Sequence, residues 1–251
     1  ALCLTISLHI IKQLNLPILF FSLEMSKEQL IYRLLATESN ISTTQLKSGN
    51  LQKENWLKLN TVIENFSEFP LFIDDTPNPS ISDIRSKIKT IIFEQKRIGL
   101  VIIDYLQLMQ YSNFKKENRV QELSQITRSL KNIAREFQIP LIALSQLSRN
   151  VENRINKRPI LSDLRESGSI EQDADLVLML YRDKYYNFSI KTQQKLESIE
   201  LIIAKQRNGP TGTIKLEFDS KQVKFFNINK KIILVVVVVT QNESYRLTNE
   251  E

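Results

Sequence analysis

The chain has 251 residues, of which 42% are apolar and 25% are charged, a balance typical of a globular protein that buries a sizeable core. Its net charge of +6 and isoelectric point near 9.3 are compatible with nucleic acid binding but do not establish it. A single cysteine, Cys3, and a single histidine, His9, exclude an intramolecular disulfide and a zinc site of clustered Cys and His, and they disfavour Ser-His-Asp catalysis.

The first part of the sequence predicts an alternation of helices and buried strands. An amphipathic helix comes first and leads to an apolar run at 18–21, which is typical of a buried strand. Ser26 is placed to cap the helix that follows. Residues 41–66 are predicted to be helical, with Trp56 on the buried face, and a short strand is predicted at 71–73.

The second part of the chain continues this alternation and then changes to consecutive strands. Helical spacing at 82–95 precedes an apolar run at 100–103, and a helix at 117–137 precedes a strand at 141–144. Further strands are predicted at 176–180, 200–204 and 213–218, with a turn signal at 208–212. This order predicts an α/β fold with a doubly wound, mostly parallel sheet flanked by helices and with antiparallel strands at its carboxy-terminal edge.

Three of the predicted strands are followed by polar side chains. The run at 100–103 ends at Asp104, and a carboxylate beyond a buried strand is one way to hold magnesium against phosphates. Taken alone, Asp104 is better explained as a cap for the next turn. Glu24 and Gln146 follow two other buried strands, however. Three such ends at one sheet edge predict a site with an acid for water activation, an acid for a metal and an amide that senses phosphate.

Several longer stretches resemble the carboxy-terminal motor domain of DnaB-type replicative DNA helicases, a hexameric RecA-like ATPase. The stretches are FSLEMS (21–26), IDDTP (73–77), VIIDYLQLM (101–109), ENRVQE (117–122), ALSQLSR (143–149), LSDLRESGSIEQDAD (161–175) and IIAKQRNGPTG (202–212). The match is nearly collinear from residue 1 to about 226, and the last two stretches are more specific than any single nucleotide-binding signature. The resemblance implies a RecA-like fold over most of the chain.

The resemblance also implies chemical roles for five residues. Glu24 would polarise the attacking water, Asp104 would bind Mg²⁺ through water, and Gln146 would sense the γ-phosphate of ATP. Lys205 and Arg207 are two residues apart, so in an extended segment they point the same way. In the family this pair reaches the γ-phosphate of a neighbouring subunit. Without the resemblance, Glu24 is an acid at a helix N-terminus, Gln146 an ordinary core-edge amide and the basic pair a solvated surface.

A further set of residues matches the family's DNA-binding loop. Arg165, Glu166 and Gly168 would follow the backbone of single-stranded DNA in the central channel, because Gly offers an approachable N–H and Arg a phosphate partner. The preceding segment is basic, which suits a loop that faces the channel, although charge runs are usually solvated. Its basic residues are Arg149, Arg154, Lys157 and Arg158.

Two features depart from the family pattern. None of the five glycines belongs to a G-x-x-x-x-G-K-[ST] motif, so the sequence contains no phosphate-cradling P-loop. In the family this loop immediately precedes the helix with which the chain begins, so we expect residue 1 to fall just after it and the amino-terminal collar domain to be missing too. The tail at 227–251 has no counterpart in the family. We therefore predict a RecA-like motor domain at 1–226 and a divergent tail.

The function has two competing hypotheses. The first is that the chain is part of a working helicase. This helicase would use ATP and Mg²⁺, move 5′ to 3′ on single-stranded DNA and unwind duplex DNA at the replication fork. Its expected partners are single-stranded DNA, further copies in a homo-hexamer, primase and a helicase loader. The second is a catalytically dead remnant that binds DNA or partner subunits without hydrolysing ATP, because no P-loop holds the phosphates. The 161–175 loop speaks against a third hypothesis, a RecA-like recombination ATPase.

The sequence also bears on the compartment. No signal peptide and no apolar run of spanning length is evident, so no membrane partner is expected. Abundant Asn, Ile and Lys favour an AT-rich genome. The expected compartment is the bacterial cytoplasm and nucleoid or the plastid stroma.

Overall fold

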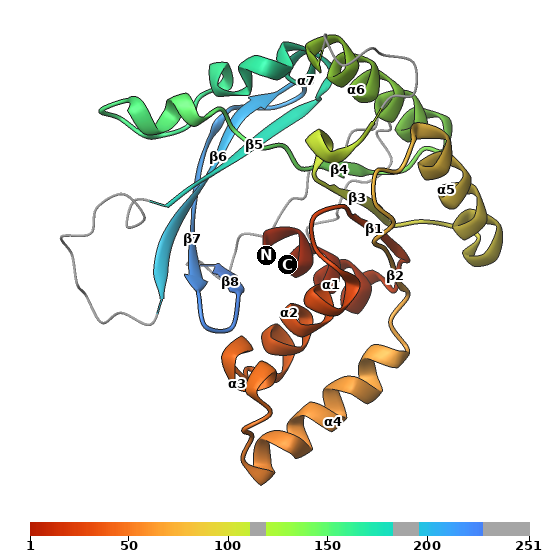
Figure 1. The fold of residues 1–251 in the computed structure, drawn as a ribbon, viewed down its shortest axis with the longest axis vertical. Helices are drawn as coiled ribbons and strands as arrows, with labels where there is room; N and C mark the ends of the chain where they lie inside the picture. The colour runs from red at the N-terminus through yellow and green to blue at the C-terminus, as the bar shows by residue number, and fades with distance from the viewer. Residues whose placement is uncertain (111–118, 183–195, 228–251) are drawn as a thin grey trace, which may run out of the picture.

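The computed structural model describes residues 1–110, 119–182 and 196–227, with residues 165–169 and 227 described by their backbone alone. Two four-stranded sheets organise these residues (Figure 1). One is parallel with the order β2-β1-β3-β4, and the other is antiparallel with the order β5-β6-β7-β8. The predicted α/β fold is therefore present. The predicted antiparallel strands are hydrogen-bonded to one another in a sheet of their own.

The parallel sheet is built on its two most apolar strands. Its members are β1 (Ile18–Ser22), β2 (Leu71–Asp74), β3 (Leu100–Asp104) and β4 (Leu141–Ala143). β1 is buried at every residue, and β3 is buried at every residue except Asp104. Continuous apolar runs suit these central strands because both faces of the sheet are covered.

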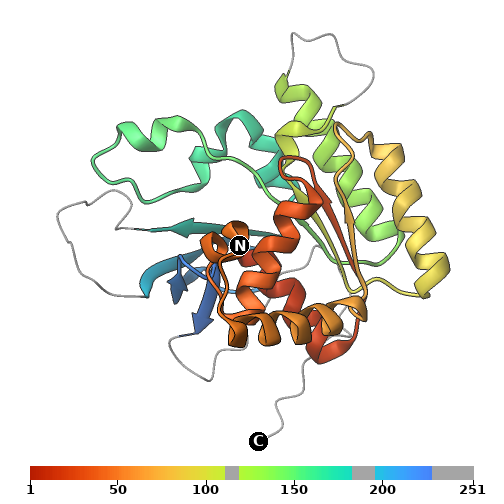
Figure 2. The same cartoon turned by 60° about the horizontal axis from the view of Figure 1, so that its bottom comes forward.

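Helices cover both faces of the parallel sheet (Figures 1 and 2). They are α1 (Leu2–Leu14), α2 (Lys27–Ser39), α5 (Ile81–Gln95) and α6 (Arg119–Glu136). Ile18 and Phe20 of β1 pack in the cluster that includes α1 and α2, whereas Leu19 and Phe21 pack in the cluster that includes α5 and α6. The division follows from strand geometry, because successive side chains point to opposite faces.

The predicted helix over residues 41–66 is two helices, α3 (Thr43–Ser48) and α4 (Lys53–Ser67). Gly49 ends α3 with a φ of 67°, a left-handed conformation that favours glycine. Trp56 on α4 is 47% exposed, so the prediction that it is buried is wrong. The reason is that α4 packs mainly against a single helix, α2, which cannot cover its whole apolar stripe.

The antiparallel sheet consists of β5 (Leu176–Tyr181), β6 (Glu197–Gln206), β7 (Gly212–Asp219) and β8 (Lys224–Asn227). The short β8 was not predicted. The turn before β8 contacts the end of α2: the Thr37 hydroxyl donates to the Gln222 carbonyl oxygen at 3.2 Å, and Gln222 Nε2 donates to the Asn40 carbonyl oxygen at 3.1 Å. These bonds tie the second sheet to the helices that cover the first.

Short helices fill the connections next to the predicted functional residues. They are η1 (Leu106–Leu108), η2 (Arg149–Asn153), η3 (Leu161–Ser167) and α7 (Gly168–Asp173). The first follows β3, and the other three lie between β4 and β5. Among the described residues, no helix combines the length and the apolar character needed to cross a bilayer.

Candidate functional site

Glu24 and Asp104 lie near each other at the carboxyl edge of the parallel sheet. Ser22 stands opposite Asp104 in the register of β1 and β3, and the Leu23 N–H donates to the Asp104 carbonyl oxygen at 2.7 Å. Glu24 is exposed and Asp104 is half-buried. Two carboxylates of different exposure therefore face the same end of the sheet, which is where ligands of open α/β sheets bind.

Gln146 reaches this edge through β4, the neighbour of β3. The Leu144 N–H donates to the Ile103 carbonyl oxygen at 2.9 Å and continues the pairing of the two strands. Gln107 then bridges them: its Nε2 donates to Ser145 Oγ at 2.9 Å and to the Gln146 carbonyl oxygen at 3.4 Å, and its Oε1 accepts from the Gln146 N–H at 3.3 Å. Sequence analysis gave Gln107 no role, although its amide stands out in an apolar run.

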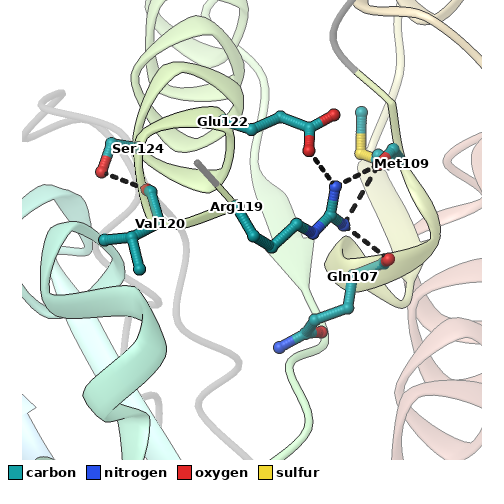
Figure 3. A network of polar contacts seen from close by, with 6 residues as sticks. All are labelled: Gln107, Met109, Arg119, Val120, Glu122 and Ser124. Carbon is teal, nitrogen blue, oxygen red and sulfur yellow. Dashed lines mark hydrogen bonds and ion pairs between the residues drawn. The ribbon is translucent and has the colours of Figure 1, made fainter. Parts of the chain in front are cut away.

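Arg119, the first residue of α6, holds the turn that follows Asp104 (Figure 3). Its guanidinium donates to the carbonyl oxygens of Gln107 at 2.6 Å and Met109 at 3.3 Å, and it forms an ion pair with Glu122. Both carbonyl oxygens belong to η1 or the residue that ends it, where a short helix lacks its own donors. Arg119 thereby fixes the loop that carries Gln107.

Replacing Arg119 with Ala should lower the free energy of unfolding by about 1–3 kcal/mol, the usual contribution of a hydrogen bond from a charged donor. Arg119→Lys should recover only part of this loss, because an ammonium cannot reproduce the guanidinium fork. Urea denaturation measures both. The matched control is Arg128→Ala, an exposed position on the same helix, which should change stability by less than about 0.5 kcal/mol. Equal losses of unfolding free energy for the Arg119 and Arg128 variants would show that the hydrogen bonds of Arg119 do not stabilise this turn.

Burial raises the pKa of Asp104 above its ordinary value, and the nearby charge of Glu24 raises it further, while Arg33 opposes the shift. The folded chain therefore binds the Asp104 proton more tightly than the unfolded chain does. The stability that this proton contributes is present below the unfolded pKa and is lost as the pH rises through the folded pKa. Ionised Asp104 thus costs stability in the chain without a bound cation.

Asp104→Asn should consequently raise the melting temperature of the cation-free protein by about 1–2 °C near neutral pH. The gain should vanish below about pH 3, where Asp104 is protonated in both states. Thermal unfolding at the two pH values measures this. Asp83→Asn is a control of opposite sign, because hydrogen bonds from Ser80 lower the pKa of Asp83 and its ionised form stabilises the fold. A lower melting temperature for Asp104→Asn at neutral pH would refute the conclusion that ionised Asp104 costs stability.

The turn that carries Glu24 is fixed on both sides. The Ser22 hydroxyl donates to the Met25 carbonyl oxygen at 2.6 Å. On the other side, the carboxylate of Asp75, which follows β2, accepts from the Lys27 N–H at 3.0 Å in the first turn of α2. The N–H groups of a first helical turn have no partner within the helix. Asp75 therefore connects β2 to the Glu24 turn, a role that sequence analysis did not find.

Lys205 and Arg207 lie at the end of β6 and contact α7. The Lys205 ammonium donates to the carbonyl oxygens of Glu171 and Gln172, and Arg207 Nη2 donates to the Gln172 carbonyl oxygen at 2.7 Å. The two side chains therefore point in one direction, as their spacing predicts. Among the described residues, no hydrogen bond or ion pair joins this pair to the polar residues at the edge of the parallel sheet.

The predicted DNA-binding residues lie between β4 and β5. Arg165 and Glu166 belong to η3 and Gly168 begins α7, and their side chains lie outside the described part of the structure. The predicted tail at 227–251 also lies outside it, apart from the backbone of its first residue. Both assignments stay predictions.

Two of the basic residues that precede η3 are bound within the chain. Arg154 Nη2 donates to the carboxylate of Asp163 at 2.6 Å, and Asp163 is only 6% exposed. Arg158 donates to Thr213 Oγ1 at 2.9 Å and forms an ion pair with Glu200. These contacts hold the basic segment to η3 and to the antiparallel sheet. Arg154 and Arg158 therefore stabilise the fold, which sequence analysis did not foresee.

Comparison with known proteins identifies the family. The family described as DnaB-like helicase C terminal domain matches residues 1–227. The chain belongs to this family. It is 68% identical over 227 residues to a "Probable replicative DNA helicase" of Trieres chinensis, covering 90% of this chain and 50% of that protein. It is 49% identical over 231 residues to "Replicative DNA helicase DnaB" of Geobacillus stearothermophilus, covering 92% and 50%. The DnaB-like domain thus spans about half the length of these relatives.

Solved structures agree with this assignment. A DnaB-like replicative helicase whose structure is described together with its interactions with primase has a TM-score of 0.77 and 40% identity, over 86% of this chain and 51% of that one. A solved ATPase domain has a TM-score of 0.78 and 40% identity, over 86% of this chain and 75% of that one. The predicted fold class of the DnaB-like domain is confirmed.

Proposed function

We propose that this DnaB-like domain is part of the motor of a replicative DNA helicase, which couples ATP hydrolysis to 5′ to 3′ movement on single-stranded DNA and unwinds duplex DNA at the fork. One observation supports this above all. Glu24 and Asp104 share the carboxyl edge of the parallel sheet in a chain of the DnaB-like family. An acid for water activation beside an acid for a metal is what nucleotide hydrolysis requires.

Glu24 would act as the general base, because it is exposed to an approaching water molecule. Asp104 would hold Mg²⁺, which when bound would neutralise charge on the phosphates of ATP. The described residues contain no group of three or more His, Cys, Asp or Glu that could hold a metal ion. This fits magnesium, which proteins usually bind through one or two carboxylates, water and substrate phosphates. The raised pKa of Asp104 also fits a cation as its partner.

Gln146, Lys205 and Arg207 would act on the γ-phosphate. Gln146 would sense it, and the bridge from Gln107 supports this role by fixing the Gln146 backbone. Lys205 lies on β6 of the antiparallel sheet and Arg207 directly follows this strand, and neither contacts Glu24 or Asp104 among the described residues. This placement supports a role in trans, at the ATP site of a neighbouring subunit in a homo-hexamer.

Single-stranded DNA would follow Arg165, Glu166 and Gly168 through the channel of that hexamer. Primase and a helicase loader are the further partners that we propose, and one structural neighbour is described with its interactions with primase. Relatives occur in bacteria and in Trieres chinensis. They support the bacterial cytoplasm and nucleoid or the plastid stroma as the compartment.

The test is unwinding of a forked DNA duplex by the full-length protein in the presence of ATP and Mg²⁺. We expect strand separation that requires ATP and a 5′ tail, and ATP hydrolysis that single-stranded DNA stimulates. A duplex with only a 3′ tail is the control and should stay annealed. DNA binding without any ATP hydrolysis would overturn the proposal and favour the catalytically dead remnant.

A further inference from the structure

Asp175, the residue before β5, connects α6, which covers the parallel sheet, to the end of β6 in the antiparallel sheet. Its carboxylate forms an ion pair with Lys131 of α6, and its Oδ1 lies 3.3 Å from Arg207 Nε. Its carbonyl oxygen also accepts from the Arg207 N–H at 2.9 Å. The side chains are 12% exposed for Lys131, 19% for Asp175 and 43% for Arg207. Lys131 and Asp175 therefore form a shielded pair, from which the Arg207 side chain extends towards solvent.

The Arg207 guanidinium is held along one edge. Nε faces Asp175, and Nη2, on the same edge, donates to the Gln172 carbonyl oxygen at 2.7 Å. Within the described residues, Nη1 has no hydrogen-bond or ion-pair partner. A guanidinium carries five N–H donors in a fixed fork, so the outer edge can still bind an anion while the inner edge stays anchored. One edge of the guanidinium is therefore anchored, and the side chain, which is 43% exposed, keeps donors that no described residue engages.

The backbone also directs this side chain. The register of β5 and β6 shifts between Val177 and Leu178, just before β6 delivers Lys205 and Arg207 to α7. Such bulges reorient the side chains of a strand and often occur next to functional sites. The Lys205 ammonium makes the parallel contact, to the Glu171 carbonyl oxygen. Carbonyl oxygens at the end of α7 thus bind both Lys205 and Arg207, and Asp175 binds Arg207 in addition.

We propose that Asp175 is a positioning residue: it anchors Arg207 so that the free edge of the guanidinium is presented to the γ-phosphate in the neighbouring subunit. This inference rests on the proposed role of Arg207 in trans. A long exposed side chain samples many rotamers, and ordering it for reaction costs conformational entropy. Holding it in one geometry beforehand removes this entropic cost from the reaction. Lys131 keeps the Asp175 carboxylate in place, because a largely buried carboxylate needs a cationic partner. Asp175 itself touches neither substrate nor metal.

The test is steady-state ATP hydrolysis by the full-length hexamer in a double-mutant cycle of Asp175→Ala and Arg207→Ala. We expect Asp175→Ala to lower kcat about 10- to 100-fold with KM for ATP changed less than about threefold, because a misplaced group costs rate without weakening substrate binding. In the Arg207→Ala background the same change should have no further effect. Glu136→Ala is the matched control: Glu136 is an acid on α6 whose carboxylate accepts from Arg85 Nη2 at 2.6 Å, without a contact to Arg207 among the described residues. It should retain kcat within about twofold of wild type.

The outcomes separate the two proposals. If Arg207→Ala alone leaves kcat unchanged, the role of Arg207 fails and the role of Asp175 fails with it. If Arg207→Ala is inactive but Asp175→Ala is active, only the inference about Asp175 is overturned. Equal losses in Glu136→Ala and Asp175→Ala, or a further loss in the double variant, would also overturn it. Should Asp175→Ala fail to assemble, Asp175→Asn removes the charge in the same shape: a kcat at least about threefold lower supports the inference, and a smaller change overturns it.

Discussion

Replacing Glu24 with Gln in a protein that carries this domain together with a P-loop should abolish ATP turnover while ATP and DNA binding persist. Glutamine keeps the shape of the side chain and its place at the end of β1, but it cannot accept a proton from water. Loss of a general base costs about 10²- to 10⁴-fold in rate. Phosphate release from ATP measures turnover. Titrations with a fluorescent ATP analogue and with single-stranded DNA measure whether ATP binding and DNA binding persist.

The matched control for this substitution is Glu28→Gln. Glu28 is an exposed acid in the first turn of α2, four residues after Glu24. Because it belongs to α2 and not to the turn that follows β1, its loss should leave kcat within about twofold of wild type. Turnover that persists in Glu24→Gln would exclude Glu24 as the base. Loss of ATP binding in that variant would instead assign Glu24 a role in holding the nucleotide.

Arg207→Ala should abolish turnover only at sites that take Arg207 from the altered subunit. An arginine finger contributes about 10³- to 10⁵-fold to phosphoryl transfer, so a homogeneous Arg207→Ala hexamer should be inactive. Mixing it with Glu24→Gln subunits gives a sharper result. An Arg207→Ala subunit still supplies Glu24, and a Glu24→Gln neighbour still supplies Arg207. Some interfaces of a mixed hexamer are then complete, so two inactive proteins should regain ATP hydrolysis together.

The complementation has a clear negative outcome. If Glu24 and Arg207 act within one subunit, every site in the mixture lacks one of them, and no mixing ratio restores hydrolysis. Lys215→Ala provides the control for altered charge, since Lys215 is an exposed cation on the neighbouring strand β7. It should be as active as wild type, alone and in every mixture. ATP hydrolysis across a series of mixing ratios, with the hexamer verified by light scattering, measures the effect.

Much of the fold follows from short-range patterns. The predicted strands at 18–21 and 100–103 match β1 and β3 to within one residue, because strands covered on both faces need an apolar side chain at every position. Ser26 caps α2 as predicted, and its hydroxyl accepts from the Gln29 N–H at 3.5 Å. The two acids of the candidate site could be found in the same way, because each follows a recognisable strand.

Predictions were wrong or incomplete where a distant segment decides the surroundings of a side chain. Trp56 belongs to an apolar stripe, but no described element covers it, so it is exposed. Arg154 and Arg158 belong to a basic run, but Asp163, Glu200 and Thr213 come into contact with them. Spacing along one helix or loop carries no information about which partner approaches from elsewhere.

The sequence by itself determined the central strands, the acids that follow them and the family to which the chain belongs. The tertiary structure alone decided which groups hold the functional segments in place. Gln107 and Arg119 fix the segments that follow β4 and β3, and Asp175 fixes Arg207. The physical reason is the range of the interactions. Strands and helix caps depend on residues a few positions away. The bond from Arg119 to Gln107 spans 12 residues and that from Lys131 to Asp175 spans 44, so both depend on how α6 packs in the fold.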